Sequence, residues 1–225
     1  MSGGGPRWVA PAFLGGHLMV QYSFDRKVKQ EVSDVSGQNS HARAVGGTWV
    51  KGGRIGGGFE FTRISDRIIA NDYRGITGDG ARTVAFWFKD AGTGKKGIVI
   101  YWGEEEDPGN LYRINFYEGK LYADGHWGDA KASRLGPTML DGDWHHAVIV
   151  YPKNGALRDI MFYVDGEADI TTVKPQQIGE DPLNTTGGQE VVIGEEALFG
   201  VLDELLIIDR ELTEAEVLQL YRSYE

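Results

Sequence analysis

Short runs in which apolar and polar side chains alternate are the main pattern along this chain, and they predict β-strands. The clearest run is 144–151 (WHHAVIVY), in which apolar side chains occupy both faces of the expected strand. A turn containing proline and glycine leads to a second run, 159–164 (DIMFYV), which ends at the turn pair Asp165-Gly166. Because a strand that is apolar on both faces must be covered on both sides, we expect a β-sandwich.

Other runs repeat the alternation and are separated by turns rich in glycine, proline and polar residues. We expect further strands at 17–24, 59–61, 83–88, 97–103, 111–117, 121–127, 191–194 and 200–209. Thr213 and Glu216 have the spacing of a capping box, which predicts a helix of about two to three turns after Thr213. The pattern therefore indicates an all-β fold, a two-sheet antiparallel sandwich with a short C-terminal helix.

The length of 225 residues fits one large sandwich, since such domains reach roughly 200–250 residues as a single unit. Glycines and prolines are frequent in residues 1–17. We therefore expect a flexible N-terminal segment at 1–17 and one domain at 18–225.

Charge and composition narrow the possible partners. The formal net charge is −10 and the isoelectric point is near 5.0, so the overall field repels nucleic acid. With no cysteine, the chain has no disulfide, thiol nucleophile or cysteine-based zinc site. No apolar run is long enough to span a bilayer, and the N-terminus lacks the pattern of a secretion signal, so we expect no membrane insertion.

Three motifs carry a family resemblance. The first is 144–151 followed by FYVDG at 162–166, the second is GVLDELLIIDRELTEAE at 200–216, and the third is YSFD at 22–25 followed by DVSGQN at 34–39. In this order they resemble laminin G-like domains of the concanavalin A-like lectin/glucanase superfamily, in particular the bacterial subtype that is often attached to extracellular enzymes. The resemblance implies a jelly-roll sandwich in an extracellular or cell-surface protein.

The resemblance also implies a structural calcium ion. In the family, the opening loop and the aspartate of the closing strand meet around the ion, which corresponds here to Asp25, Asp34, Asn39 and Asp203. Calcium takes roughly six to eight oxygen ligands, and these residues would supply several of them. The alternative is that Asp34 caps a turn and Asp203 faces solvent.

Aromatic and polar residues gather in neighbouring hairpins and form a candidate sugar-binding site. Aromatic rings stack on the apolar faces of sugars, while carboxylates, amides and arginines bind the hydroxyl groups. The candidates are Tyr101, Trp102, Glu104, Tyr112, Arg113, Asn115, His126 and Trp127, with Tyr117 and Tyr122 in the same hairpins. The alternative is that Trp102 and Trp127 belong to the core, since aromatic residues at alternating positions are often buried.

The sequence contains no recognisable catalytic motif for cleaving a polysaccharide. No strand has the E-x-D-x-E pattern that places acids on one face, and the adjacent Asp203 and Glu204 are expected to point to opposite faces. The sequence therefore favours a non-catalytic, lectin-like module that binds a polysaccharide or glycan and is stabilised by calcium. A protein-binding adhesion module and a polysaccharide-cleaving glycosidase or lyase remain the alternatives.

Overall fold

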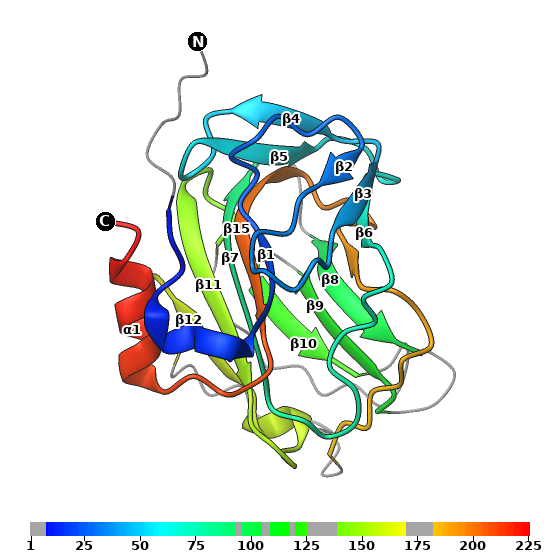
Figure 1. The fold of residues 1–225 in the computed structure, drawn as a ribbon, viewed down its shortest axis with the longest axis vertical. Coiled ribbons are helices and arrows are strands. Elements are labelled where there is room, and N and C mark those ends of the chain that lie inside the picture. The colour runs from blue at the N-terminus through cyan, green and yellow to red at the C-terminus, as the bar shows by residue number, and fades with distance from the viewer. Residues whose placement is uncertain (1–7, 93–95, 105–108, 118–119, 126–138, 170–181) are drawn as a thin grey trace.

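The computed structural model describes residues 8–92, 96–104, 109–117, 120–125, 139–169 and 182–225. These residues form two antiparallel sheets that pack face to face, with one short α-helix against the side of the sandwich (Figure 1). The all-β sandwich predicted from the alternating pattern is confirmed, and so is its C-terminal helix.

The first sheet is built around the two strands that contain the longest apolar runs, β7 and β15. Its order is β13 (Glu167–Ala168), β12 (Met161–Val164), β11 (Trp144–Tyr151), β7 (Arg82–Asp90), β15 (Gly200–Ile208), β5 (Gly57–Phe61) and β4 (Thr48–Lys51). Strand β1 (Leu18–Tyr22) lies outside this path and pairs with β15. The predicted hairpin is therefore the β11–β12 pair, in which Ala147 lies opposite Val164.

The second sheet contains the strands of the candidate sugar site. Its order is β10 (Lys120–Asp124), β9 (Leu111–Tyr117), β8 (Lys96–Gly103), β14 (Val192–Ile193), β6 (Arg67–Ala70), β3 (Ala42–Val45) and β2 (Glu31–Val32). Strands close in sequence, such as β8, β9 and β10, are neighbours, but β14 inserts between β8 and β6. This insertion brings the residues after β14 next to β6 and β8.

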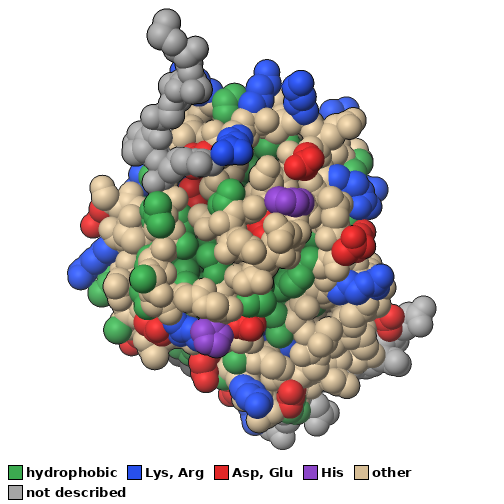
Figure 2. Space-filling view, viewed as in Figure 1, with side chains coloured by type: hydrophobic (Ala, Val, Ile, Leu, Met, Phe, Trp, Pro, Cys, Tyr) green, Lys and Arg blue, Asp and Glu red, His purple; other side chains and the backbone are tan. Residues whose placement is uncertain are grey.

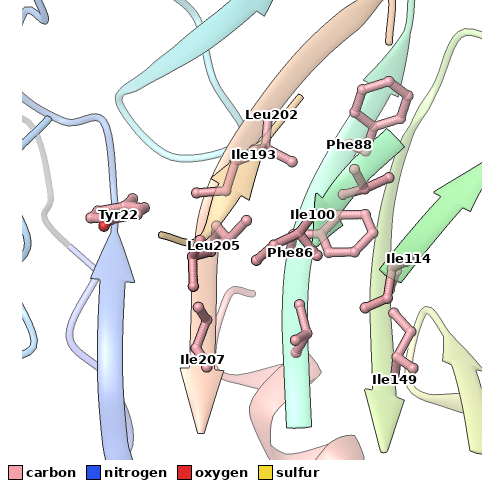
Figure 3. Close-up of a cluster of buried hydrophobic side chains, with 14 of the residues drawn as sticks. Tyr22, Phe86, Phe88, Ile100, Ile114, Ile149, Ile193, Leu202, Leu205 and Ile207 are labelled. Atoms are coloured by element: carbon pink, nitrogen blue, oxygen red, sulfur yellow. The ribbon is translucent and has the colours of Figure 1, made fainter. Parts of the chain in front are cut away.

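The main core fills the space between the two sheets. Phe86 and Phe88 of β7 lie in this layer with Ile100 of β8, Ile114 of β9 and Ile149 of β11, and all five side chains are at most 1% exposed (Figure 3). Burial of large apolar side chains stabilises each by roughly 1.5–3 kcal/mol before the entropy cost of folding. This layer explains the apolar inner face of each strand.

A second apolar cluster covers the outer side of the first sheet. Helix α1 (Glu214–Arg222) contributes Val217 and Leu220, which pack with Val148 of β11 and Leu206 of β15. The short 3₁₀ helix η1 (Ala12–His17) lies beside α1, and another, η2 (Leu157–Asp159), follows β11 (Figure 1). The second covering layer that β11 requires is therefore made by helices.

None of the helices in the described part of the chain is long and apolar enough to cross a membrane.

The start of the chain differs from the expectation of a loose segment at 1–17. Leu14 is 1% exposed within the second cluster, and the ring of Trp8 stacks on Tyr224 with 4.2 Å between ring centroids. Residues 8–17 are therefore part of the folded unit, because their apolar side chains help to cover the first sheet. Residues 1–7 lie outside the described residues.

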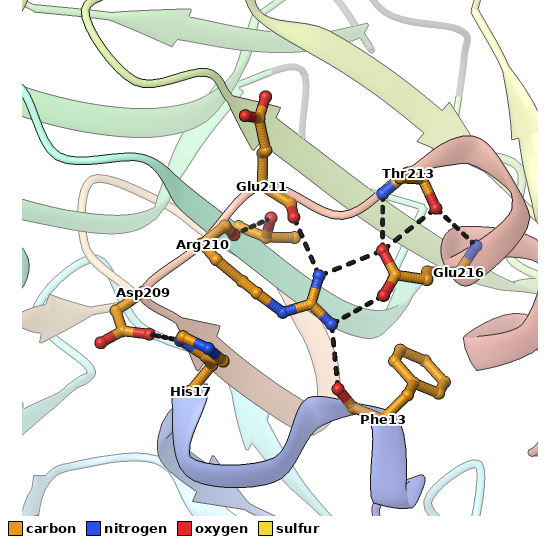
Figure 4. Close-up of polar contacts among 8 residues, drawn as sticks. Phe13, His17, Asp209, Arg210, Glu211, Thr213 and Glu216 are labelled. Carbon is orange, nitrogen blue, oxygen red and sulfur yellow. Dashed lines mark hydrogen bonds and ion pairs between the residues drawn. The ribbon is translucent and has the colours of Figure 1, made fainter.

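Polar contacts connect this segment to the C-terminal helix (Figure 4). Arg210 donates hydrogen bonds to both carboxylate oxygens of Glu216, at 3.0 and 2.8 Å, and to the carbonyl of Phe13 at 3.0 Å. His17 Nδ1 lies 2.7 Å from Asp209 Oδ1. The predicted capping box is confirmed, since Thr213 and Glu216 each accept a bond from the other's backbone N–H.

Replacing Glu216 tests the contribution of this junction. The pKa of the Glu216 carboxyl is lowered from an ordinary 4.5 to about 2. The main cause is the hydrogen bonding from Arg210, which outweighs the opposite effect of burial. Because the folded pKa is the lower one, the carboxylate stabilises the fold above about pH 4.5, and this contribution is lost as pH falls toward 2. We expect Glu216→Gln to lower the free energy of unfolding by about 1–2 kcal/mol at pH 7, and by much less near pH 3.

Urea denaturation at the two pH values measures this difference. Glu214→Gln is the matched control, because Glu214 lies in the same first helical turn but takes no part in the bonds to Arg210. An equal loss of stability at both pH values, or an equal loss in the control, would contradict the assignment.

Candidate functional site

The outer face of the second sheet carries a band of polar and tyrosine side chains, which we name the polar face. The inner positions of its strands belong to the core, so the intervening residues point outward. The polar face consists of Arg43, Arg67, Tyr101, Arg113, Asn115, Tyr117, Tyr122 and Asp124 on the strands, together with Glu190 and Glu195 on either side of β14.

A buried ion pair fixes one end of the polar face. Arg113 on β9 lies directly opposite Asp124 on β10 and binds it in a fork, with Nη2 2.7 Å from Oδ1 and Nε 3.1 Å from Oδ2. Asn115 donates a further hydrogen bond to Asp124 Oδ2 at 2.7 Å. The side chains of Arg113 and Asp124 are 7% and 9% exposed, so this fork orients Asn115 and contributes little surface to a ligand.

The tyrosines of the polar face provide accessible aromatic surface. Tyr117 is 50% exposed and meets Tyr122 edge to face, with 5.7 Å between ring centroids. Tyr101 is partly exposed, and its hydroxyl donates a hydrogen bond to Glu195 Oε2 at 2.8 Å. Rings held in this way can stack on an apolar sugar face while their hydroxyls bind polar groups.

Two predicted ligand-binding residues lie in the core instead. Trp102 and Tyr112 are both 0% exposed and pack against each other with 4.6 Å between ring centroids. Trp102 Nε1 also donates to the carbonyl of Ile76 at 3.0 Å. The prediction that they stack on a ligand is wrong, because the alternation within β8 and β9 turns both side chains toward the opposite sheet.

The remaining predicted residues of this site lie at its margin or beyond the described residues. Glu104 is exposed just after β8, and its side chain lies over Gly188, where a Cβ atom would collide with the carboxylate. His126 and Trp127 lie outside the described residues, so their role in binding stays a prediction.

Sequence reasoning missed two ion pairs on the same face. Arg67 Nη1 lies 3.7 Å from Glu195 Oε1, and Arg43 Nη1 lies 3.5 Å from Glu190 Oε2. Alternation within β3 and β6 indicates that both arginines point outward. Their glutamate partners are more than 120 residues away in sequence, and no local pattern indicates that β14 lies beside β6.

A second group of charged side chains lies on the first sheet, where β15 has a β-bulge. The register of β15 with β7 shifts between Asp203 and Leu206, and Glu204 has a φ of 48°. Leu202 and Leu205 both belong to the core between the sheets, so the two residues between them, Asp203 and Glu204, do not alternate across the sheet. Asp203 lies opposite Trp87, whose ring belongs to the outer cluster. The expectation that the two acids point to opposite faces is therefore wrong, because the bulge interrupts the alternation.

The two acids of the bulge are almost completely removed from water. Asp203 and Glu204 are 0% exposed, and burial, followed by repulsion from neighbouring carboxylates including Asp25, raises the pKa of both side chains above the ordinary range. Asp203 accepts backbone N–H bonds from Ile55 at 3.0 Å and from Glu204 at 2.9 Å. Burial and the neighbouring carboxylates therefore favour the neutral form of both side chains.

The other two predicted calcium ligands have different surroundings. Asp34 accepts hydrogen bonds from the backbone N–H groups of Gln21, Ser36 and Ser40 at 2.8–3.0 Å, and from the Ser36 hydroxyl at 2.7 Å. Asn39 is exposed and has a φ of 60°. Asp34 thus organises its own loop, and in the described part of the chain no three His, Cys, Asp or Glu side chains are arranged as a metal cage.

The fold defines the class of protein. Two antiparallel sheets packed face to face, with one short α-helix, form an all-β sandwich. Residues 62–218 match the family model described as the concanavalin A-like lectin/glucanases superfamily. The chain belongs to this family, as its motifs predicted. A search of curated proteins finds no matching sequence.

Solved structures with the same fold include binding domains of several kinds. The receptor-binding domain of botulinum neurotoxin D is 18% identical and superposes with a TM-score of 0.64, covering 93% of this chain and 53% of that chain. Domain 4 of AbnA, an extracellular arabinanase from Geobacillus stearothermophilus solved with arabinotriose, is 17% identical, with a TM-score of 0.65 and coverage of 91% and 98%.

A further structure is the binding domain of botulinum neurotoxin DC in complex with rat synaptotagmin II, which is 12% identical. It has a TM-score of 0.65, with coverage of 93% of this chain and 52% of that chain. This chain thus spans about half the length of the neurotoxin binding domains and nearly the whole of the arabinanase domain. At these identities the likeness establishes the fold.

Proposed function

We propose that this chain is a non-catalytic carbohydrate-binding module that binds its ligand on the polar face. The observation that carries the proposal is the edge-to-face pair of the exposed Tyr117 and the partly buried Tyr122. The pair lies beside Asn115, which the buried Arg113–Asp124 fork holds in place. Tyrosine rings bind the apolar face of a sugar, and the amide binds its hydroxyl groups. The arabinotriose complex of AbnA domain 4 supports the choice of a sugar as ligand.

The surroundings of the carboxylates on the polar face favour binding over hydrolysis. Asp124 is held by Arg113 and Asn115, and Glu195 by Tyr101 and Arg67. A glycosidase needs two carboxyl groups that face each other across the scissile bond, roughly 5–9.5 Å apart. Carboxylates that are already engaged by neighbouring donors suit ligand positioning better than proton transfer.

The second candidate function is protein binding. It is supported by the synaptotagmin complex of the neurotoxin DC binding domain, which has the same fold. Both functions suit an extracellular or cell-surface module, which we propose as the location of this chain.

A panel of soluble polysaccharides distinguishes these functions. The chain is run through affinity gels that contain each polysaccharide, and the release of reducing or unsaturated ends is measured in parallel. We expect retardation that free sugar competes away and no new ends. New ends that disappear when one acid is replaced would show an enzyme. Absence of retardation, together with capture of a protein that free sugar does not displace, would favour the adhesion module.

We further propose that the bulge of β15 holds a calcium ion, with Asp25 and Asp203 among its ligands and Glu204 beside them. Support comes from the buried carboxylates, whose pKa values are raised by burial and by mutual repulsion that a cation would cancel. The ion would brace the junction between the loop after β1 and strand β15.

A thermal melt tests the calcium proposal. An ion that binds only the folded state at about a hundred times its dissociation constant adds about 2.7 kcal/mol. We therefore expect excess calcium to raise the Tm by more than about 4 °C relative to a chelator. Asp203→Asn should remove most of this difference, and an unchanged Tm in the unaltered chain would contradict the proposal.

A further inference from the structure

The ion pairs beyond Tyr101 extend the polar face across the second sheet. Glu195 bridges two strands, because its Oε1 lies 3.7 Å from Arg67 of β6 and its Oε2 accepts the hydroxyl of Tyr101 of β8 at 2.8 Å. The side chains of Arg67 and Glu195 are 34% and 29% exposed, so a ligand can reach both. Guanidinium, carboxylate and phenol groups therefore form one connected, accessible group on the same face of the sheet as the tyrosine pair.

The next strand carries a second pair of the same kind. Arg43 of β3 lies 3.5 Å from Glu190, with side chains that are 49% and 30% exposed, and it also donates to Asn71 at 3.3 Å. In the β3–β6 pair, Arg67 lies opposite Val45, which is two residues after Arg43 on β3. The two outward arginines are therefore offset by two residues along the strands. The polar groups thus continue in steps from β8 to β3.

The charges of the extended face balance. Arg43, Arg67 and Arg113 are each matched by one carboxylate, from Glu190, Glu195 and Asp124 in turn. Figure 2 shows basic and acidic side chains interspersed along the side where β3 and β6 lie. A carboxylate accepts a hydrogen bond from a hydroxyl group, and a guanidinium donates one to a hydroxyl oxygen. An anionic sugar would instead be repelled by the glutamates and by the chain's net charge of −10. The balance favours a neutral, hydroxyl-rich ligand.

The length of the face sets the size of the ligand. From β8 to β3 there are three strand spacings, and from β10 to β3 there are five. At about 4.8 Å each, these distances are about 14 and 24 Å. Both exceed the width of one sugar ring, so a monosaccharide would leave most of the face empty.

We propose that the Arg67–Glu195 and Arg43–Glu190 pairs form an extended subsite that recognises a neutral oligosaccharide lying across the strands. This inference rests on the proposed carbohydrate-binding function. It adds that the sugar is neutral and that the binding site includes a part of the polar face that the sequence motifs do not indicate. Tyr117 and Tyr122 hold one end of the ligand, while the arginine–glutamate pairs bind hydroxyl groups further along.

Affinity gels test the class of sugar. The neutral probes are linear arabinan, xylan and mixed-linkage glucan, and the anionic probes are polygalacturonate and heparin. We expect at least one neutral polymer to retard the chain and neither anionic polymer to do so at physiological salt. Retardation by the anionic polymers alone would overturn the inference while leaving the proposed function standing. No retardation by any of the five would overturn both.

Arg67→Ala tests the extended subsite with the neutral polymer that binds best. Titration with its hexasaccharide and its disaccharide should show about a tenfold loss of affinity for the longer ligand, and little change for the shorter one. Arg63→Ala is the matched control, since Arg63 pairs with Asp66 in the turn between β5 and β6 and is 70% exposed. Unchanged hexasaccharide affinity in Arg67→Ala, or an equal loss for both lengths, would overturn the subsite.

Discussion

Replacing Arg82 with lysine is expected to lower the free energy of unfolding by about 3 kcal/mol or more, because a buried network would lose its donors. Arg82 is 0% exposed at the start of β7 and donates to the carbonyls of Gly80, Ile76 and Gly78 at 2.8–3.0 Å. It also binds the hydroxyl of Thr185 at 2.8 Å. A lysine cannot reproduce this planar set of donors, so several buried acceptors would be left unsatisfied.

The aromatic residues around Arg82 add to the effect. Its guanidinium carbon lies 5.0 Å from the ring centroid of Tyr151 and 5.3 Å from that of Tyr112, within the range of cation–π contacts. Urea denaturation measures the loss, with Arg63→Ala as an exposed arginine control that should change stability by less than about 0.5 kcal/mol. A loss in Arg82→Lys as small as that in the control would contradict the structural role.

Trp102→Ala is expected to lower the free energy of unfolding by about 3–5 kcal/mol through the cavity it leaves in the core. The ring is 0% exposed, packs on Tyr112, and lies so close to Gly75 that a Cβ atom there would collide with it. The milder Trp102→Phe keeps an aromatic ring and provides a folded variant if the alanine variant does not fold. Thermal and urea denaturation measure the effect.

Glycan binding by the Trp102 variants separates a core residue from a ligand-binding residue. We expect the folded fraction of Trp102→Phe to bind polysaccharide as the unaltered chain does, because the ring lies between the sheets. A loss of binding without a loss of stability would show that Trp102 contacts the ligand after all.

The fold could be predicted from the sequence largely because alternation is a local property. In β9, the periodicity alone places Tyr112 and Ile114 on one face and Arg113, Asn115 and Tyr117 on the other, and the structure agrees. The prediction that Tyr112 binds a ligand was wrong because it grouped residues that are close in sequence without asking which face of the strand each occupies. The same rule, applied to β8, separates the outward Tyr101 from the buried Trp102.

Non-local pairing explains what could not be predicted. Glu195 meets Arg67 and Tyr101 because β14 lies between β6 and β8, and strand order depends on long-range packing that no short motif encodes. Asp203 and Glu204 share a side because of a bulge with Glu204 at positive φ, a conformation that is uncommon for glutamate. Alternation cannot anticipate a residue that breaks it.

The central claim is that the tyrosines of the polar face bind carbohydrate, and the most direct measurement is polysaccharide affinity in the double variant Tyr117→Ala/Tyr122→Ala. Losing two stacking rings should weaken binding by more than about tenfold, while thermal melts show the fold intact. Ile64→Ala, which removes an exposed apolar side chain in the turn after β5, is the control and should bind normally. Equal affinity in the double variant and the unaltered chain would contradict the account.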